Sequence, residues 1–310
     1  RLEATVTLDQ LLAVAKMPEV LFIDPWGPME ADMDIVRMYF GTDYVEGITG
    51  FSGEGVRGEV FDTGLYTEHQ EFTHQTIIAH GTLTPGSHGT SVAGVIFARG
   101  ARPSARGILP DGQLLASNSF FDFTNRYRHH GELVDPSLQY RAVFQTNSTG
   151  SPRTTDYTTI SAEMDRILFD HDMVVCQSQS NSGTLPSRPQ AWAKNMLAVG
   201  GFYHNGTLTR ADDRHGGSGS TGPASDGRVK PDLSAFYDGI ESASSGVSSY
   251  GQFGGTSGAT PITCGHIGLL HQMWHEGTFP GYPAGGPGAT VFDSRPHMTT
   301  PKAMLINTAG

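Results

Sequence analysis

The sequence predicts one α/β domain built on a mostly parallel sheet with helices on both faces. From about residue 50 onward, short apolar runs alternate with helical patterns of roughly 10 to 15 residues, which is typical of such a sheet. The glycine-rich stretch 216–228 is a loop, because the runs on both sides of it continue the same alternation. No internal repeat or coiled-coil heptad is present. We place the domain at residues 46–310, after a preamble at 1–45.

The preamble contains two predicted elements. Apolar side chains at residues 8–14 have the spacing of a short amphipathic helix. Residues 20–23 are apolar throughout and predict a strand, which the pair Asp24-Pro25 would end.

Strands and helices then follow one another along the domain. Residues 56–61 predict a strand that ends in Asp62-Thr63-Gly64, and residues 157–170 carry apolar side chains at helical spacing. Further strands are predicted at 173–176 and 195–202. Further helices are predicted at 87–100, 258–277 and 301–309.

The composition excludes several classes of protein. The 310 residues carry a formal net charge of −11, which argues against nucleic acid or an anionic membrane as the main partner, since phosphates attract clustered Lys and Arg. No apolar run approaches the ~18 residues that a membrane-spanning helix needs. With only two cysteines, the zinc-finger and fibrous classes are excluded as well.

Three short segments place a reactive side chain at a change in backbone structure. Asp62 follows a predicted strand, so its carboxylate emerges at the carboxyl end, where sites form in open α/β sheets. His88 opens a predicted helix whose small residues let the imidazole stand close to packed backbone. Ser257 directly precedes the helix at 258–277, where N–H groups and the dipole favour negative charge. Pro261 then falls within the first turn, where its missing N–H costs nothing.

Asp, His and Ser in this order and in these contexts predict nucleophilic catalysis. His88 would remove the proton of Ser257, and Asp62 would hold the imidazole tautomer and stabilise its cation. Taken singly, the three residues are compatible with a turn-capping aspartate, a helix-start histidine and an N-cap serine. Their combination favours catalysis.

Over nearly all of residues 50–310 the chain resembles the subtilisin-like serine proteases. Three segments in the family's order carry the resemblance: VRGEVFDTG around Asp62, SHGTSVAGVIFA around His88 and GGTSGATP around Ser257. SQSNSG, DGRVKPDLSA and PKAMLINTA support it. The resemblance implies a subtilisin-like three-layer α/β fold and a serine endopeptidase that works through an acyl-enzyme and requires no cofactor.

The resemblance also implies roles for residues outside the triad. Asn181 in SQSNSG matches the asparagine whose side-chain amide holds the oxyanion together with the backbone N–H of Ser257. A further segment matches the one that pairs with substrate backbone and lines the specificity pocket, so an extended peptide would bind as an added strand. Its residues are Asn147, Ser148, Thr149 and Gly150.

The chain departs from the family pattern at three positions. Gly258 stands where these proteases usually carry methionine after the nucleophile, which should widen the leaving-group side and loosen the turn. Ser180 replaces the usual glycine before the oxyanion asparagine, and Thr149 stands where a bulkier residue is common. These differences concern efficiency and specificity more than the class of reaction.

Two other functions stay open on the sequence. The same acyl-enzyme could pass to an amine, which would make the protein a peptide ligase or macrocyclase. Alternatively, the chain is a catalytically dead relative that only binds extended peptides, although its catalytic residues are intact.

The sequence assigns no metal site. His69, His74 and His80 lie five and six residues apart, which fits no single helical face, so we interpret them as solvated loop histidines. Asp212 and Asp213 could supply carboxylates, and members of the resembled family often hold calcium, but no stretch has the pattern of an EF-hand loop. Structural calcium therefore stays an option without assigned ligands.

The two cysteines allow two interpretations. Cys176 lies on the predicted strand that leads to Asn181, and Cys264 lies on the predicted helix of the nucleophile. They are either two buried thiols or a disulfide between strand and helix, which would suit a secreted enzyme.

The ends of the chain suggest processing. Position 1 is Arg rather than Met, and residues 1–45 resemble the closing part of the propeptides that accompany these proteases; a simple helix and strand packed on the domain is the alternative. We therefore expect a secreted or cell-envelope enzyme that acts on proteins or peptides, with its own propeptide as inhibitor and chaperone. Since many relatives continue past the final LINTAG into a β-rich domain, truncation before such a domain is compatible with the sequence.

Overall fold

The computed structural model describes residues 6–18, 20, 32–119 and 125–309. The chain falls into two compact units, Arg1–Ala31 and Asp32–Gly310. The smaller unit contains α1 (Leu8–Val14), which begins with a capping box between Thr7 and Gln10 and has no buried residue. The helix predicted at 8–14 is therefore confirmed. Nearly all of the strand predicted at 20–23, and the Asp24-Pro25 pair after it, lie outside the described residues.

The larger unit begins with two helices that lie before or across the boundary placed at residue 46. They are α2 (Asp32–Tyr39) and α3 (Thr42–Thr49). Arg37 of α2, only 3% exposed, donates to the Asp43 carboxylate at 2.6 Å and to the carbonyl of Gly107 at 2.5 Å. These contacts attach α2 and α3 to the body of this unit.

A seven-stranded sheet forms the middle of the larger unit. Its order is β2-β3-β1-β4-β5-β6-β7, and every neighbouring pair is parallel, as the sequence predicts. The strands are β1 (Arg57–Asp62), β2 (Ile78–Ala79), β3 (Gln113–Asn118), β4 (Phe144–Asn147), β5 (Val174–Ser178), β6 (Leu197–Phe202) and β7 (Leu233–Phe236). A separate antiparallel pair consists of β8 (Ile240–Ala243) and β9 (Tyr250–Phe253).

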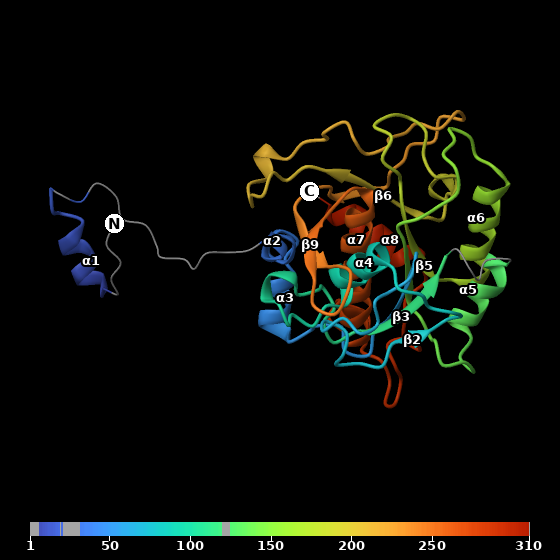
Figure 1. Ribbon diagram of the computed structural model, residues 1–310. Coiled ribbons are helices and arrows are strands. Elements are labelled where there is room, and N and C mark those ends of the chain that lie inside the picture. Colours follow the sequence, from blue (N-terminus) through green and yellow to red (C-terminus); the bar gives the residue numbers. More distant parts are fainter. Residues whose placement is uncertain (1–5, 19, 21–31, 120–124, 310) are drawn as a thin grey trace. The chain divides into compact units, whose positions relative to one another are not determined.

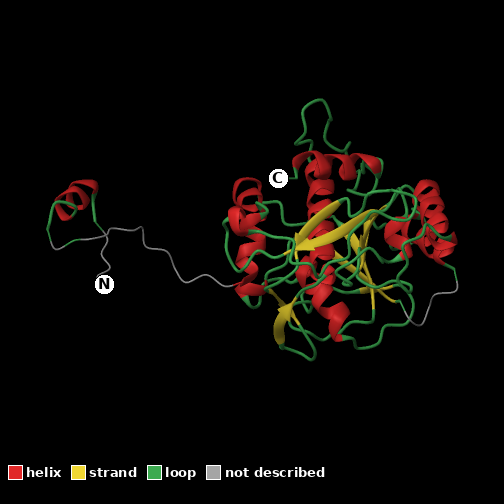
Figure 2. Ribbon diagram, turned by 90° about the horizontal axis from the view of Figure 1, so that it is seen from above, coloured by secondary structure: helices red, strands yellow, loops and turns green. Residues whose placement is uncertain are grey.

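Helices cover both faces of the sheet (Figure 1). One face carries α4 (Ser87–Phe97), α7 (Thr256–His275) and α8 (Thr299–Thr308), and the other carries α5 (Arg126–Val134) and α6 (Thr159–His171). In Figure 2, α7 runs through the centre of this unit, while the pair α5 and α6 stands at one side. The result is the three-layer α/β architecture predicted from the sequence.

The strands are buried on both faces, which is expected of a parallel sheet between two helix layers. The five residues of β5 and the four of β4 are all buried. Phe144 of β4 stacks on Phe97 of α4 at 6.2 Å between ring centroids, which joins the central strands to the helix layer. No described helix is long and apolar enough to cross a membrane.

Candidate active site

Asp62 and His88 meet at the carboxyl end of the sheet. Asp62 is the last residue of β1 and 1% exposed, and His88 is the second residue of α4. The His88 Nδ1 lies 2.6 Å from the Asp62 Oδ1, which also accepts the Thr63 N–H at 2.7 Å. The close approach depends on Gly89, because a Cβ there would lie 2.1 Å from the Gly64 carbonyl oxygen. The predicted role of small neighbours beside His88 is thus confirmed.

The electrostatics of this pair favour a charged imidazole. Burial on its own lowers the pKa of His88, but the hydrogen bond and the negative charge of Asp62 outweigh it, so the pKa lies above its usual value of 6.5. The ring is 35% exposed, and its Nε2 has no hydrogen bond to any described residue. Phe253 packs edge-on against it at 5.4 Å. His88 therefore has one nitrogen held by Asp62 and one open to a reacting group.

Ser257 lies at the start of α7, as predicted. Thr256 is the first residue of this helix and Ser257 the second, after Gly255 with φ +73°. A side chain at Gly255 would be strained at this φ and would lie 3.3 Å from the Asn181 amide. The Ser257 N–H precedes the helical hydrogen bonds and has no acceptor among the described residues. It is therefore available to an incoming oxyanion.

The prediction that Pro261 lies in the first turn is wrong. Pro261 is the sixth residue of α7, where it removes the N–H that would have bonded the Ser257 carbonyl four residues earlier. The hydroxyl of Ser148 replaces that donor at 3.0 Å, and the Ser257 hydroxyl donates to the Ser148 carbonyl at 3.4 Å. The helix tolerates the proline because a neighbouring loop supplies the missing hydrogen bond.

The structure joins Asp62 to His88 but does not join Ser257 to His88 by a hydrogen bond. Among the described residues, the Ser257 hydroxyl donates to the Ser148 carbonyl instead. In enzymes without bound substrate this contact is often long or poorly aligned and tightens in the complex.

Asn181 is fixed with its amide nitrogen outward. Its Oδ1 accepts the backbone N–H of Thr256 at 2.9 Å and the Thr256 hydroxyl at 3.0 Å. Since the oxygen is occupied, Nδ2 is the free, exposed end of the side chain. The preceding residue, Ser180, has φ +114° and is buried, which is the backbone conformation that glycine tolerates best.

The segment predicted to bind substrate begins at the end of β4. Asn147 is fully buried, and its amide donates to Gln145 at 2.9 Å, so its side chain points into the protein. Ser148 contacts the nucleophile as described, Thr149 bonds Ser119 through its hydroxyl at 3.4 Å, and Gly150 is exposed. The chain therefore emerges toward solvent between Ser148 and Gly150.

Gly258 is buried and faces other side chains. A Cβ at this position would lie 2.5 Å from the Ile240 Cδ1 and 3.6 Å from the Phe253 ring. The expected effect of Gly258 on the leaving-group side and on the turn stays a prediction.

The interpretation of His69 and His80 as solvated is also wrong. His69 is fully buried with its Nε2 2.8 Å from the Ser249 carbonyl, and His80 is 7% exposed. His74 is exposed as expected. The loop between β1 and β2 folds back onto the protein, which spacing along the chain does not reveal.

Asp212 and Asp213 are engaged by hydroxyl groups of the protein. The Asp212 carboxylate accepts the Thr207 hydroxyl at 3.0 Å, and Asp213 accepts the hydroxyl of Tyr39. These contacts give the pair a structural use without a metal.

Cys176 and Cys264 are free, buried thiols, which agrees with the first of the two interpretations. Burial raises the pKa of Cys264 well above its usual 9.0, and its Sγ donates to the Gln145 carbonyl at 3.4 Å. A thiol held protonated in this way is a poor nucleophile, so Cys264 is not a candidate for a catalytic role.

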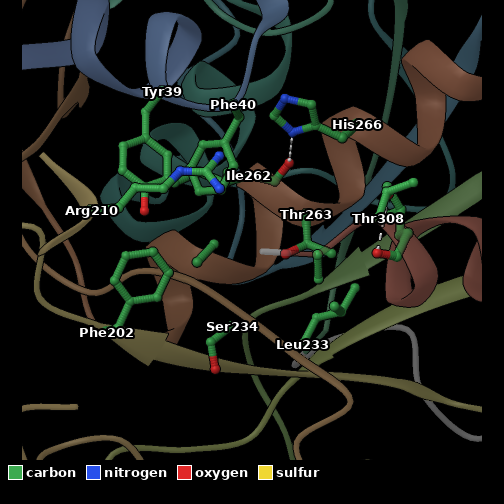
Figure 3. A pocket seen from close by; sticks show the side chains of 13 residues that line it. Tyr39, Phe40, Phe202, Arg210, Leu233, Ser234, Ile262, Thr263, His266 and Thr308 are labelled. Atoms are coloured by element: carbon green, nitrogen blue, oxygen red, sulfur yellow. Dashed lines mark hydrogen bonds between the residues drawn. The ribbon is translucent and has the colours of Figure 1, made fainter. Parts of the chain in front are cut away.

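A cavity of about 230 Å³ elsewhere in the larger unit contains none of the predicted site residues (Figure 3). Tyr39, Phe202 and Arg210 line it, together with His266 from the middle of α7. Burial lowers the pKa of His266 to about 4, so this imidazole is neutral at pH 7. The cavity is smaller than the ~300 Å³ at which small-molecule sites begin. The candidate active site is instead the open surface around His88.

Comparisons with known proteins identify similar proteases. Serine protease AprX of Bacillus subtilis (strain 168) is 26% identical over 264 residues, covering 72% of this chain and 58% of that protein. Membrane-bound transcription factor site-1 protease of Mus musculus is 29% identical over 233 residues, covering 71% of this chain and 21% of that protein. The chain thus spans between a fifth and three fifths of these relatives.

Solved structures share the fold. The prenylagaramide maturation protease PagA superposes with a TM-score of 0.66 at 19% identity, over 87% of this chain and 88% of that one. A cold-adapted subtilisin-like serine proteinase superposes with a TM-score of 0.58 at 19% identity, over 83% of each chain. The sequence pattern of the subtilase family matches residues 56–309. Because this match covers most of the chain, the protein belongs to the subtilase family of serine proteases.

Proposed function

We propose that this protein is a serine endopeptidase in which Ser257 is the nucleophile, His88 the general base and acid, and Asp62 its partner. The observation that carries the proposal is the 2.6 Å contact between His88 and the buried Asp62, at the sheet edge that α7 also approaches. That contact fixes the proton on Nδ1 and leaves Nε2 to accept another.

The reaction follows in two balanced halves. His88 takes the proton of the Ser257 hydroxyl while the oxygen attacks the substrate carbonyl, and the imidazolium then passes this proton to the leaving amine. The C–N bond breaks and an ester on Ser257 remains. Water attacks that ester while His88 takes its proton, and the proton returns to the Ser257 oxygen as the acid is released. None of these steps needs a cofactor.

Two donors are placed for the negative charge of the tetrahedral intermediate. They are the Nδ2 of Asn181 and the backbone N–H of Ser257, both without an acceptor among the described residues. Removing one such donor costs ~10²–10³ in kcat, a magnitude known from a subtilisin. The two hydrogen bonds from Thr256 hold the Asn181 amide in this orientation before substrate arrives.

The substrates we propose are proteins or peptides bound in extended form. Residues 148–150 leave the sheet beside Ser257 and turn toward solvent, so a peptide could pair with their backbone as an added strand. We also propose export to the cell envelope or medium, with the end of a propeptide lying within residues 1–45 and before α2, because α2 and α3 are attached to the larger unit. N-terminal sequencing of enzyme secreted from a full-length gene tests the latter, since an intact N-terminal extension on active enzyme contradicts it.

A fluorophosphonate probe tests the nucleophile. On the purified chain, mass spectrometry should find one adduct, on Ser257, which is lost in His88→Ala and retained in the control His74→Ala, where an exposed histidine is removed. Folded protein that gives no adduct in any chain would overturn the triad and favour a relative that only binds peptides.

The fate of the acyl-enzyme needs a separate measurement. With a peptide substrate and a large excess of an amine nucleophile, an endopeptidase should release mainly the free acid. A product that is mainly the amide would instead identify a peptide ligase or macrocyclase.

A further inference from the structure

A second polar cluster lies on the face of β1 opposite to the catalytic pair. Side chains alternate along the strand, so Glu59 points toward α5 while Asp62 points toward α4. Glu59 is fully buried. Two histidines lie beside it, His80, which directly follows β2, and His129 of α5, and each is 7% exposed. Three separate elements therefore bring a carboxylate and two imidazoles to one buried point.

The spacing of these groups is that of metal ligands. The Glu59 carboxylate lies 3.4 Å from the His80 Nδ1 and 2.9 Å from the His129 Nε2, and all three ligand atoms fall within 4.8 Å of one another. Bonds of 2.0–2.1 Å in a tetrahedral zinc site place ligand atoms about 3.3 Å apart. A modest rotation of the two imidazoles, which stack at 3.9 Å between centroids, would bring all three atoms onto one ion.

Neighbouring residues orient these ligands as they do around known metal centres. The Nε2 of His80 bonds the Glu132 carboxylate at 2.9 Å, which leaves its Nδ1, buried and without a hydrogen-bond partner, aimed at Glu59. The Gln145 amide donates to the other Glu59 oxygen at 2.5 Å. A ligating histidine that gives its second N–H to a carboxylate is the usual arrangement in zinc sites.

The charge of the cluster also suits a divalent cation. Glu59 supplies one carboxylate to the cluster, and Glu132 places a second one at its edge, bonded to the Nε2 of His80. One carboxylate and two imidazoles are a donor set that favours zinc over calcium or magnesium, which prefer oxygen.

We propose that Glu59, His80 and His129 form a zinc site, with water in the fourth position. The ion would fasten the end of β2 and helix α5 to the interior strand β1, three residues before Asp62. This proposal does not rest on the proposed peptidase activity. The competing explanation is a metal-free network in which protonated histidines, and Arg126 through Gln145, balance the charge of Glu59.

Metal content distinguishes the two explanations, measured on the full chain carrying Ser257→Ala so that self-digestion plays no part. After addition of Zn²⁺ and gel filtration, we expect about one zinc per chain, and below about 0.1 in His129→Gln. The matched control is His74→Gln, which removes an exposed histidine from the same region and should keep the full amount. Binding of zinc by His129→Gln equal to that by the control would overturn the proposal.

Metal binding is also measured on the Ser257→Ala chain with all three ligands intact, because a ligand variant could fail to fold. Co²⁺ added to the chelator-treated protein should give the intense visible absorption of a tetrahedral site, and Zn²⁺ should displace it. Glu132→Gln, which keeps all three ligands, should weaken zinc affinity by about 10- to 100-fold. A folded protein that takes up neither Zn²⁺ nor Co²⁺ would establish the metal-free network instead.

Discussion

Ser180 occupies a backbone conformation that its own side chain makes costly. Its φ of +114° falls in a region where residues with a Cβ are rare. Two hydrogen bonds hold the backbone there: the Ser180 N–H donates to the Thr256 hydroxyl at 3.3 Å, and the Ser220 N–H donates to the Ser180 carbonyl at 2.7 Å. Such a residue stores on the order of 1–3 kcal/mol of strain. The strain lies directly before Asn181 and keeps its amide against Thr256.

Ser180→Gly should therefore stabilise the protein by about 1 kcal/mol, because glycine adopts this φ freely. Urea unfolding in the Ser257→Ala background measures the change. The matched control, Ser245→Gly, alters an exposed serine without a positive φ and should destabilise by a few tenths to about 1 kcal/mol. Loss of stability in Ser180→Gly equal to that of the control would contradict the strain.

The pKa of His88 sets the acid limit of activity. A general base must be unprotonated, and Asp62 holds the pKa of His88 above 6.5, so kcat/KM should rise with pH through a midpoint above 6.5. Asp62→Asn should move the midpoint down and lower kcat by about 10⁴. A midpoint that is the same in both chains would mean that Asp62 does not govern His88.

At the scale of elements, the first turns of α7 depend on a loop outside the helix. Pro261 leaves the Ser257 carbonyl without its helical donor, and the Ser148 hydroxyl supplies one at 3.0 Å. The carbonyl of Ser257, the proposed nucleophile, is thus bonded by Ser148, which belongs to the segment proposed to bind substrate.

A double-mutant cycle tests this dependence. Ser148→Ala should cost about 1 kcal/mol, because it leaves the partly buried Ser257 carbonyl without a donor from the protein. Pro261→Ala restores the backbone N–H at residue 261 as a donor to the Ser257 carbonyl. In that background the cost of Ser148→Ala should therefore fall by at least about 0.5 kcal/mol, which is the smallest coupling that such cycles resolve. Urea unfolding of the four chains gives the coupling, and strictly additive effects would show that Ser148 does not substitute for the missing donor.

The elements predicted from the sequence are those with a strong apolar pattern. The helices at 157–170 and 258–277 and the strand at 195–202 are all confirmed within two residues at each end. Helix α5 was not predicted, because its buried residues include His129 and His130 rather than an apolar stripe. Strands β4 and β7 were missed for a similar reason, since each has only four residues and some are polar.

At the scale of the whole molecule, one buried lysine links charge to stability. Lys230 is 5% exposed, donates to the Met196 carbonyl at 2.9 Å and contacts Asp232 at 2.6 Å. Burial lowers its pKa from 10.5 to about 8. The negative charge of Asp232 raises the pKa and partly offsets burial, whereas the positive charge of Lys302 lowers it slightly further. The folded chain therefore gives up this proton at a lower pH than the unfolded chain does.

Between pH 8 and about 10 the unfolded chain keeps a proton that the folded chain has lost, so raising the pH favours the folded state. This residue should add about 2 kcal/mol to the free energy of unfolding across that range. Urea unfolding at pH 8, 9 and 10 should show the rise in the parent chain and in the exposed control Lys194→Met, but not in Lys230→Met. Equal slopes in all three would contradict the assignment.

The sequence identified the residues proposed as catalytic, but not the contacts that position them. Asp62, His88 and Asn181 lie in local motifs, each at the end of a strand or the start of a helix, so their neighbours along the chain are informative. The exchange of hydrogen bonds between Ser148 and Ser257, and the approach of His80 to Glu59, join segments far apart along the chain. No spacing rule reports such contacts, because the fold alone sets their geometry.

The strand order has a consequence for how the molecule is made. The interior strand β1 is the first strand of the sheet to be synthesised, whereas α7 with Ser257 is among the last elements. Roughly 200 residues, or on the order of 10–40 s of translation, separate Asp62 from Ser257. With the roles proposed above, a growing chain therefore has no nucleophile beside its base until most of the domain has left the ribosome.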